Sequence, residues 1–128
     1  LCRAQSSRRT FPAKFDPARD PAKDVAAAAT AAKAQGKRVI VDVGGEWCSW
    51  CHLLDRFIGD NADVRALRDK GYVWIKVNWS KENKNEAFLS RWPKIEGYPH
   101  LFVLDGDGNE GSRLCEMVSG HAVSAFLG

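Results

Sequence analysis

The stretch that most constrains the fold runs from Val39 to Ile58 and reads VIVDVGGEWCSWCHLLDRFI. Its first residues are nearly all β-branched and apolar, which is typical of a strand covered on both faces. Gly44 and Gly45 then end the strand. From Cys48 onward the apolar residues return every three or four positions, as they do on the buried face of a helix. The stretch therefore predicts a buried strand, a glycine turn and a helix that opens with two cysteines.

The two cysteines at the start of this helix are expected to differ in chemistry. Cys48 is predicted at the helix N-terminus, where free N–H groups and the helix dipole stabilise a thiolate and lower its pKa. Cys51 lies about one turn further, at the head of the apolar face, so it is expected to be less exposed and less easily ionised. Exchange through a mixed disulfide requires one attacking and one resolving cysteine. The spacing predicts Cys48 as the attacking residue and Cys51 as the resolving residue.

Two charged residues lie within otherwise apolar strands. Asp42 belongs to the strand before the cysteines, and burial of its carboxylate is expected to raise its pKa. It is close enough in sequence to accept the proton of Cys51, directly or through water, so Asp42 is a candidate catalytic residue. Lys76 interrupts a second apolar strand at Tyr72 to Trp79. It is either a lysine that snorkels at a strand end or a partner for Asp42.

The segment Val41 to Cys51 reads V-D-V-x-x-E-W-C-x-x-C and resembles the signature of the thioredoxin superfamily. Gly97-Tyr98-Pro99, followed by the apolar residues 101–104, resembles the cis-proline loop of that family and the strand after it. Lys76 matches a lysine that the family places close to the buried acid. The Trp-Cys-x-Trp-Cys-His form is similar to bacterial thioredoxin-related reductases. The resemblance covers roughly Val25 to Gly120, which is most of the chain.

This resemblance implies an α/β, thioredoxin-like fold with a central mixed β-sheet flanked by helices. It implies a thiol–disulfide oxidoreductase that acts on protein disulfides, with a reductase favoured over an oxidase or an isomerase. No metal or organic cofactor is expected, and another protein must restore the electrons. The Tyr98–Pro99 bond is expected to be cis, so that Tyr98 and Pro99 bind an extended substrate beside Cys48.

Four residues depart from the family pattern. Ser49-Trp50 replaces the Gly-Pro of thioredoxin, Gly44 takes a position that is usually aromatic, and His100 follows the proline where threonine is common. These departures leave the redox potential and the partner open, while the two cysteines that carry the chemistry are both present.

Three further residues flank the cysteines and are candidates for binding or tuning. Trp47 and Trp50 lie on either side of Cys48, where aromatic surface suits an unfolded or extended partner. A structural role for both tryptophans is the alternative. The positive form of His52 would favour a Cys48 thiolate, and the alternative is a partly exposed helix residue with no such effect.

At 128 residues the chain is long enough for one domain with its own core, predicted at residues 20–128 after a tail or surface arm at residues 1–19. The net charge of +3 is too small to indicate nucleic-acid binding. No apolar run approaches the roughly twenty residues of a membrane span. The protein is expected to be a monomer. The chain begins with Leu1, which fits either a removed export signal or a cloning boundary. The family resemblance favours a periplasmic or otherwise exported protein, with a cytoplasmic one as the alternative.

The remaining elements follow from capping, turn and periodicity signals. Asp20 and Pro21 predict the start of a helix that Gly36 ends, and Asn61 is expected to cap a helix that Gly71 ends. The later predictions are a helix at 81–92, a strand at 100–105, a turn at 105–109, a returning strand at 112–118 and a short last helix at 123–127.

Other classes of protein share parts of this pattern. Cys48 to His52 also reads C-x-x-C-H, the attachment motif of c-type haem, with His52 and Met117 as axial ligands. Haem attachment requires neither the buried strand with Asp42 nor the proline loop, so the exchange site is favoured. A zinc site would need Cys51 and His52, which are adjacent, to converge on one ion. A non-enzymatic binding module on the same fold is the third alternative. Cys2 and Cys115 either form a bridge or remain free.

Overall fold

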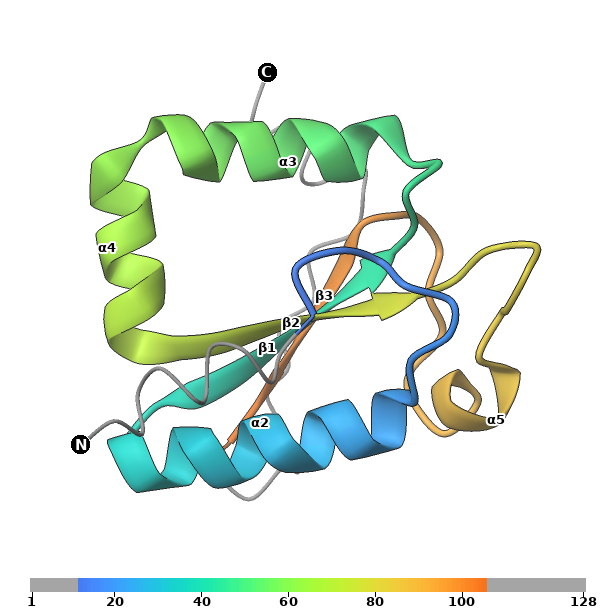
Figure 1. Ribbon diagram of the computed structural model, residues 1–128, viewed down its shortest axis with the longest axis horizontal. Coiled ribbons are helices and arrows are strands. Elements are labelled where there is room, and N and C mark those ends of the chain that lie inside the picture. Colours follow the sequence, from blue (N-terminus) through green and yellow to red (C-terminus); the bar gives the residue numbers. More distant parts are fainter. Residues whose placement is uncertain (1–11, 106–128) are drawn as a thin grey trace.

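The computed structural model describes residues 12–105, and Figure 1 shows how their elements are arranged. The elements in chain order are α2 (Pro21–Gln35), β1 (Arg38–Gly44), α3 (Ser49–Asp60), α4 (Ala62–Gly71), β2 (Tyr72–Asn78), α5 (Glu86–Leu89) and β3 (His100–Leu104). The predicted turn, returning strand and last helix after residue 105 lie outside the described residues, as do Cys2, Cys115 and Met117.

The described strands form a mixed sheet in the order β2-β1-β3, which confirms the predicted α/β architecture. β1 pairs parallel with β2 and antiparallel with β3. The register places Asp42 of β1 between Lys76 of β2 and Leu101 of β3. Because side chains alternate across a strand, these three residues point to the same face of the sheet.

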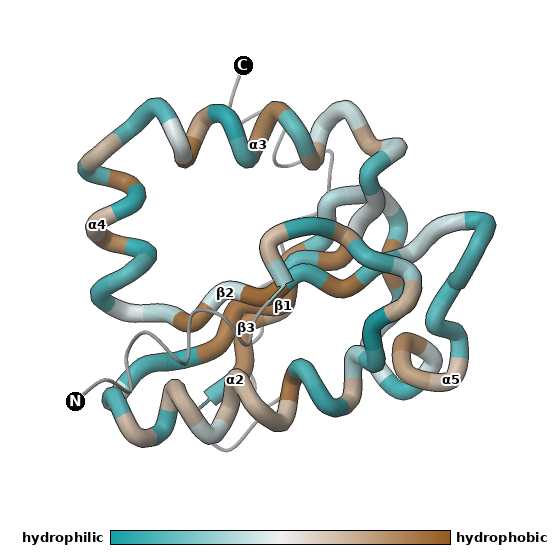
Figure 2. The backbone as a smooth tube through the Cα atoms, viewed as in Figure 1, coloured by the Kyte–Doolittle hydropathy of each residue, from teal (hydrophilic) through white to brown (hydrophobic). Residues whose placement is uncertain are grey.

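The two faces of the sheet carry different helices, with α3 above the sheet and α2 below it in Figure 1. The α2 side holds the larger apolar cluster, to which all three strands contribute. On the other side Leu54 and Ile58 of α3 pack with Trp74 and Leu101. Figure 2 shows the strands as the most continuously hydrophobic part of the described chain, with helices of mixed hydropathy on either side. Within residues 12–105, none of the helices has the length and apolar character needed to cross a membrane.

Helix α2 begins and ends as its sequence predicts. The Asp20 side chain accepts hydrogen bonds from the backbone N–H groups of Ala22 and Lys23. Gly36 takes the left-handed conformation at the C-terminus, with φ of 68°. Ala28 and Ala32 are fully buried against the sheet, because their small side chains let the helix approach closely.

Asn61 is the N-cap residue of α4, as predicted, but its side chain bonds elsewhere, and the helix predicted at 81–92 is shorter than expected. Asn61 makes no side-chain capping bond to α4; its Nδ2 donates instead to the Phe57 carbonyl at the end of α3, over 2.6 Å. The helix predicted at 81–92 is limited to α5. The loop before α5 is held by asparagine side chains, with Asn78 donating to Ser80 and Asn85 donating to the Asn78 carbonyl. These bonds compete with helical hydrogen bonds and delay the start of the helix.

Candidate redox site

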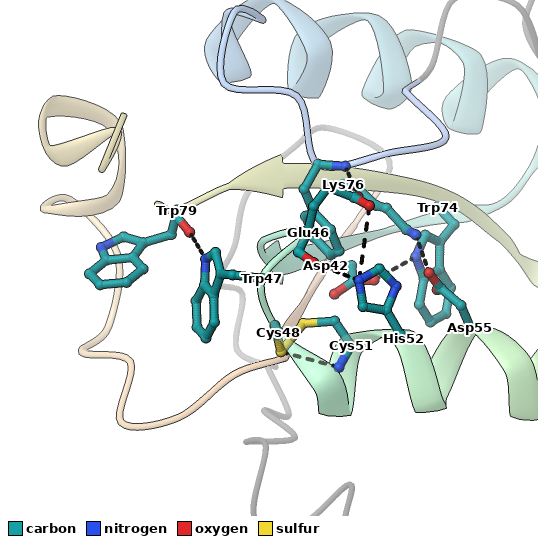
Figure 3. The surroundings of a disulfide bond; sticks show 11 residues. Asp42, Glu46, Trp47, Cys48, Cys51, His52, Asp55, Trp74, Lys76 and Trp79 are labelled. Atoms are coloured by element: carbon teal, nitrogen blue, oxygen red, sulfur yellow. Dashed lines mark hydrogen bonds and ion pairs between the residues drawn. A yellow bond between two sulfur atoms is a disulfide. The ribbon is translucent and has the colours of Figure 1, made fainter. Parts of the chain in front are cut away.

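Cys48 and Cys51 form a disulfide at the N-terminus of α3, as Figure 3 shows. Cys48 is the N-cap residue, and its sulfur accepts a hydrogen bond of 3.1 Å from the Cys51 backbone N–H. The predicted position of Cys48 at the helix start is therefore confirmed, and its sulfur lies where the helix dipole stabilises negative charge. Both residues are buried, with exposed fractions of 3% for Cys48 and 1% for Cys51. Phe15 and Tyr98 pack against the disulfide, so Cys48, the predicted attacking residue, is almost fully buried in the disulfide form.

Asp42 lies on the face of β1 that α3 covers, and it is buried as predicted. Burial raises the pKa of its carboxyl from 3.8 to about 7, because the charged form loses its hydration. The positive charge of Lys76 and a 3.2 Å hydrogen bond from the Trp74 indole N–H act in the opposite direction. Among the described residues no group bonds to the second carboxyl oxygen, Oδ1. The carboxyl can therefore bind or release a proton near neutral pH.

Lys76 forms an ion pair with Asp55 of α3, and its role toward Asp42 stays a prediction. Its Nζ lies 2.5 Å from the Asp55 carboxylate, and only 11% of its side chain is exposed. It acts on Asp42 through its charge, which lowers the pKa of Asp42, while the charge of Asp55 raises it. Sequence reasoning missed Asp55. The available signal was its position four residues after Cys51, which places the two on one side of α3.

His52 is held by the turn that precedes α3. Its Nε2–H donates to the Glu46 carbonyl over 2.7 Å, and the same nitrogen lies 4.0 Å from the Glu46 carboxylate. The ring is therefore oriented by the residues immediately before the disulfide, and its influence on Cys48 stays a prediction.

An aromatic cluster of Trp47, Trp79 and Tyr98 lies beside the disulfide. The Trp47 indole N–H donates to the Trp79 carbonyl over 2.7 Å, and the Trp79 and Tyr98 rings stack with centroids 5.0 Å apart. Trp47 and Trp50 remain exposed, at 54% and 40%. Figure 3 shows Trp47 and Trp79 on one side of the disulfide and the Asp42 group on the other. Sequence reasoning missed Trp79, although it directly follows β2.

An open groove of about 700 Å³ extends from this aromatic cluster along α5. Its lining includes Trp79 and Tyr98 at one end and Leu89, Trp92 and Ile95 further along. The groove includes Tyr98, one of the residues that the sequence predicts to contact an extended partner, and continues away from the disulfide.

The Tyr98–Pro99 peptide bond is cis, as predicted, and Pro99 is fully buried. His100 follows it and is also buried, with its ring centroid 4.5 Å from that of Phe102. Neither ring nitrogen of His100 has a hydrogen-bond partner among the described residues, and burial lowers the pKa of its imidazole. The proposed binding of substrate by Tyr98 and Pro99 stays a prediction.

The alternative metal and haem sites receive no support from the side-chain arrangement. Within the described part of the chain, no three His, Cys, Asp or Glu side chains converge as metal ligands would. The two sulfur atoms of the C-x-x-C-H motif are joined to each other, and the His52 Nε2–H is bonded to Glu46.

Comparison with known proteins agrees with this geometry. A family described as Thioredoxin-like matches residues 20–106. The thiol:disulfide interchange protein DsbD of Klebsiella pneumoniae is 26% identical over 98 residues, which cover 75% of this chain and 16% of that protein. The DsbD of Pseudomonas fluorescens is 30% identical over 98 residues, with the same shares of 75% and 16%. The chain thus spans only a small part of the length of these relatives.

Solved structures show the same fold at low sequence identity. A disulphide isomerase from Xylella fastidiosa Temecula1 has a TM-score of 0.70 and 21% identity, covering 91% of this chain and 94% of that chain. The structure of DsbH oxidoreductase has a TM-score of 0.55 and 20% identity, covering 80% of this chain and 81% of that one. These likenesses establish a thioredoxin-like fold.

Proposed function

Because this chain belongs to the thioredoxin-like family, we propose that it is a thiol–disulfide oxidoreductase that reduces protein disulfides. The observation that carries the proposal is the Cys48–Cys51 disulfide at the N-terminus of α3, above the buried carboxyl of Asp42. The relatives named as thiol:disulfide interchange proteins support the same reaction class.

The reduced protein would act through two exchange steps. The Cys48 thiolate attacks one sulfur of the substrate disulfide, the substrate S–S bond breaks, and the leaving sulfur takes up a proton. Cys51 then loses its proton and attacks the Cys48 sulfur, which releases the second substrate thiol and forms the Cys48–Cys51 disulfide. Two electrons pass from the protein to the substrate, each released substrate sulfur takes up one proton from its surroundings, and a protein electron donor must restore the dithiol.

Asp42 is the proposed acceptor of the Cys51 proton. It lies on the face of β1 toward α3, the helix that carries Cys51, and its pKa of about 7 suits proton transfer near neutral pH. Lys76 is held by its ion pair with Asp55. Its positive charge would limit the rise in the pKa of Asp42 that burial causes, so that the charged carboxylate form can be reached.

The aromatic surface favours a protein or peptide substrate. Trp47, Trp50 and Tyr98 surround the disulfide, and the groove along α5 continues this surface. Such a surface suits an extended segment whose backbone pairs beside the attacking sulfur. By resemblance to bacterial thioredoxin-related reductases, we assign the reaction to an exported compartment.

Two cysteine variants test this function. Cys48→Ser should abolish the reduction of insulin disulfides, because the attacking sulfur is lost. Cys51→Ser should retain the first attack and accumulate a mixed disulfide with the substrate, which mass spectrometry of the intact adduct would detect. Near-wild-type reduction by the Cys48→Ser protein would overturn the assignment.

A further inference from the structure

Gly44 leaves a space beside Cys51 that an aromatic ring from a distant segment fills. A Cβ atom at position 44 would collide with the Cys51 sulfur and lie 3.2 Å from the ring of Phe15. Phe15 belongs to the N-terminal arm, residues 12–19, and is only 2% exposed. It forms one buried cluster with Cys48 and Cys51. Phe15 therefore occupies the space beside Cys51 that the absent side chain of Gly44 leaves open.

The N-terminal arm is attached at several points around the redox site. The Phe15 backbone N–H donates to the Glu46 carboxylate over 2.9 Å, and Glu46 lies two residues before Cys48. The Lys76 ammonium lies 4.8 Å from the centre of the Phe15 ring, in cation–π geometry. Further along the arm, Asn83 donates to the Pro17 carbonyl over 2.9 Å. The Phe15 ring therefore contacts the two cysteines on one side and Lys76, which acts on Asp42, on the other.

We propose that Phe15 is a positioning residue for thiol–disulfide exchange, which excludes water and outside reagents from Cys51 and holds Lys76 near Asp42. This inference rests on the proposed function. With Phe15 in place, Cys51 is only 1% exposed and packs in one buried cluster with Phe15 and Cys48. Outside sulfur atoms are thereby directed to Cys48, while Cys51 is reserved for the resolving step.

The reactivity of Cys51 tests the proposal directly. In a Cys48→Ser background, the Cys51 thiolate displaces iodide from iodoacetamide, and peptide mass spectrometry separates its adduct from those of Cys2 and Cys115. Phe15→Ala should raise the alkylation rate of Cys51 at least about tenfold, because both access and thiolate fraction increase. The profile of rate against pH should also move to lower pH, since water that reaches Cys51 favours its thiolate. Phe15→Leu, which retains most of the apolar volume, should stay within about threefold of the parent.

A second pair of variants loosens the arm without changing its ring. Glu46→Ala removes the acceptor of the Phe15 N–H, whereas Glu46→Gln removes only the charge and retains an acceptor oxygen. Cys51 should react faster in the Ala variant than in the Gln variant. This pair decides the question if Phe15→Ala does not fold, as judged by circular dichroism.

Unchanged Cys51 alkylation in the folded Phe15→Ala protein, or equal rates in the two Glu46 variants, would overturn the inference. Neither result bears on the proposed function, which fails separately if the wild-type dithiol does not reduce insulin. Faster alkylation of Cys51 with normal insulin reduction by the wild type supports both.

Discussion

At the scale of single residues, Asp42 is the group whose environment most affects both stability and reaction. Its carboxyl is fully buried, it accepts one hydrogen bond from Trp74, and its Oδ1 has no partner among the described residues. A carboxylate in such a place loses hydration that the surroundings only partly replace. The residue is therefore expected to lower stability when it is charged, which is the state that accepts a proton.

Asp42→Asn should stabilise the oxidised protein at high pH but not at low pH. The pKa of Asp42 is raised in the folded state to about 7, so the folded protein holds a proton that the unfolded chain loses above 3.8. Its stability consequently falls as pH rises through this interval, and the full penalty, on the order of 4 kcal/mol, is reached above pH 7. Asn carries no charge and avoids the penalty. Denaturant unfolding at pH 4 and pH 8 measures the difference.

Asp69→Asn is the matched control for this prediction. Asp69 lies on α4 with 68% of its side chain exposed, and its exposed ion pair with Arg68 contributes little, within about 1 kcal/mol. Its substitution should change stability by a similar small amount at both pH values. A pH-independent effect of Asp42→Asn would contradict the assignment of a raised pKa.

At the scale of elements, the turn between β1 and α3 sets the position of the aromatic cluster. Gly45 packs closely against the Trp47 indole. A Cβ added at Gly45 would collide with that indole and approach the Trp79 carbonyl oxygen to 2.8 Å. The same carbonyl accepts the Trp47 indole N–H. The absence of a side chain at position 45 is therefore what lets the end of β2 contact the start of α3.

Gly45→Ala should displace Trp47, lower stability by about 1–3 kcal/mol and reduce kcat/KM for insulin. Gly59→Ala is the matched control in α3, because an added Cβ there meets nothing within 4 Å. That variant should be stabilised by up to about 1 kcal/mol, since alanine favours the helix over the unfolded chain. Denaturant unfolding and the insulin assay measure both variants. Equal behaviour of the two proteins would show that contact with the indole is not what makes Gly45 necessary.

At the scale of the whole molecule, the direction of exchange depends on how the fold stabilises the disulfide relative to the dithiol. The disulfide is packed in a buried cluster with Phe15 and Tyr98, which favours the neutral bonded form over two thiols that can ionise. The position of Cys48 at the helix N-terminus acts in the opposite direction, because it stabilises a thiolate.

We expect burial to dominate, so that equilibration of the Cys48–Cys51 pair with glutathione yields a potential below about −200 mV, in the range of reductases. The populations of dithiol and disulfide are measured by alkylating the free thiols and determining the mass of the intact protein by mass spectrometry. A potential near about −120 mV, typical of a dedicated disulfide donor, would reverse the assigned direction.

Local patterns in the sequence predicted most of the described elements and the candidate residues of the site. The start of α2 at Asp20, the helix position of Cys48 and the burial of Asp42 each depend on neighbours within a few residues. Family resemblance added the cis bond at Pro99. The two differences from prediction, in the use of the Asn61 side chain and in the length of the helix predicted at 81–92, arose where an asparagine side chain can bond to more than one backbone group.

The surroundings of the site were decided by the tertiary structure. Pairing of β1 with β2 brings Trp74 and Lys76 to the face of Asp42, and packing of α3 on that face brings Asp55 to Lys76. Phe15 reaches the space beside Gly44 only when the N-terminal arm lies against the redox site. Sequence by itself determined which residues have the required chemistry, because propensity, capping and burial patterns act over short distances. Only the fold determined which of them meet, because contacts between distant segments depend on strand register and helix packing.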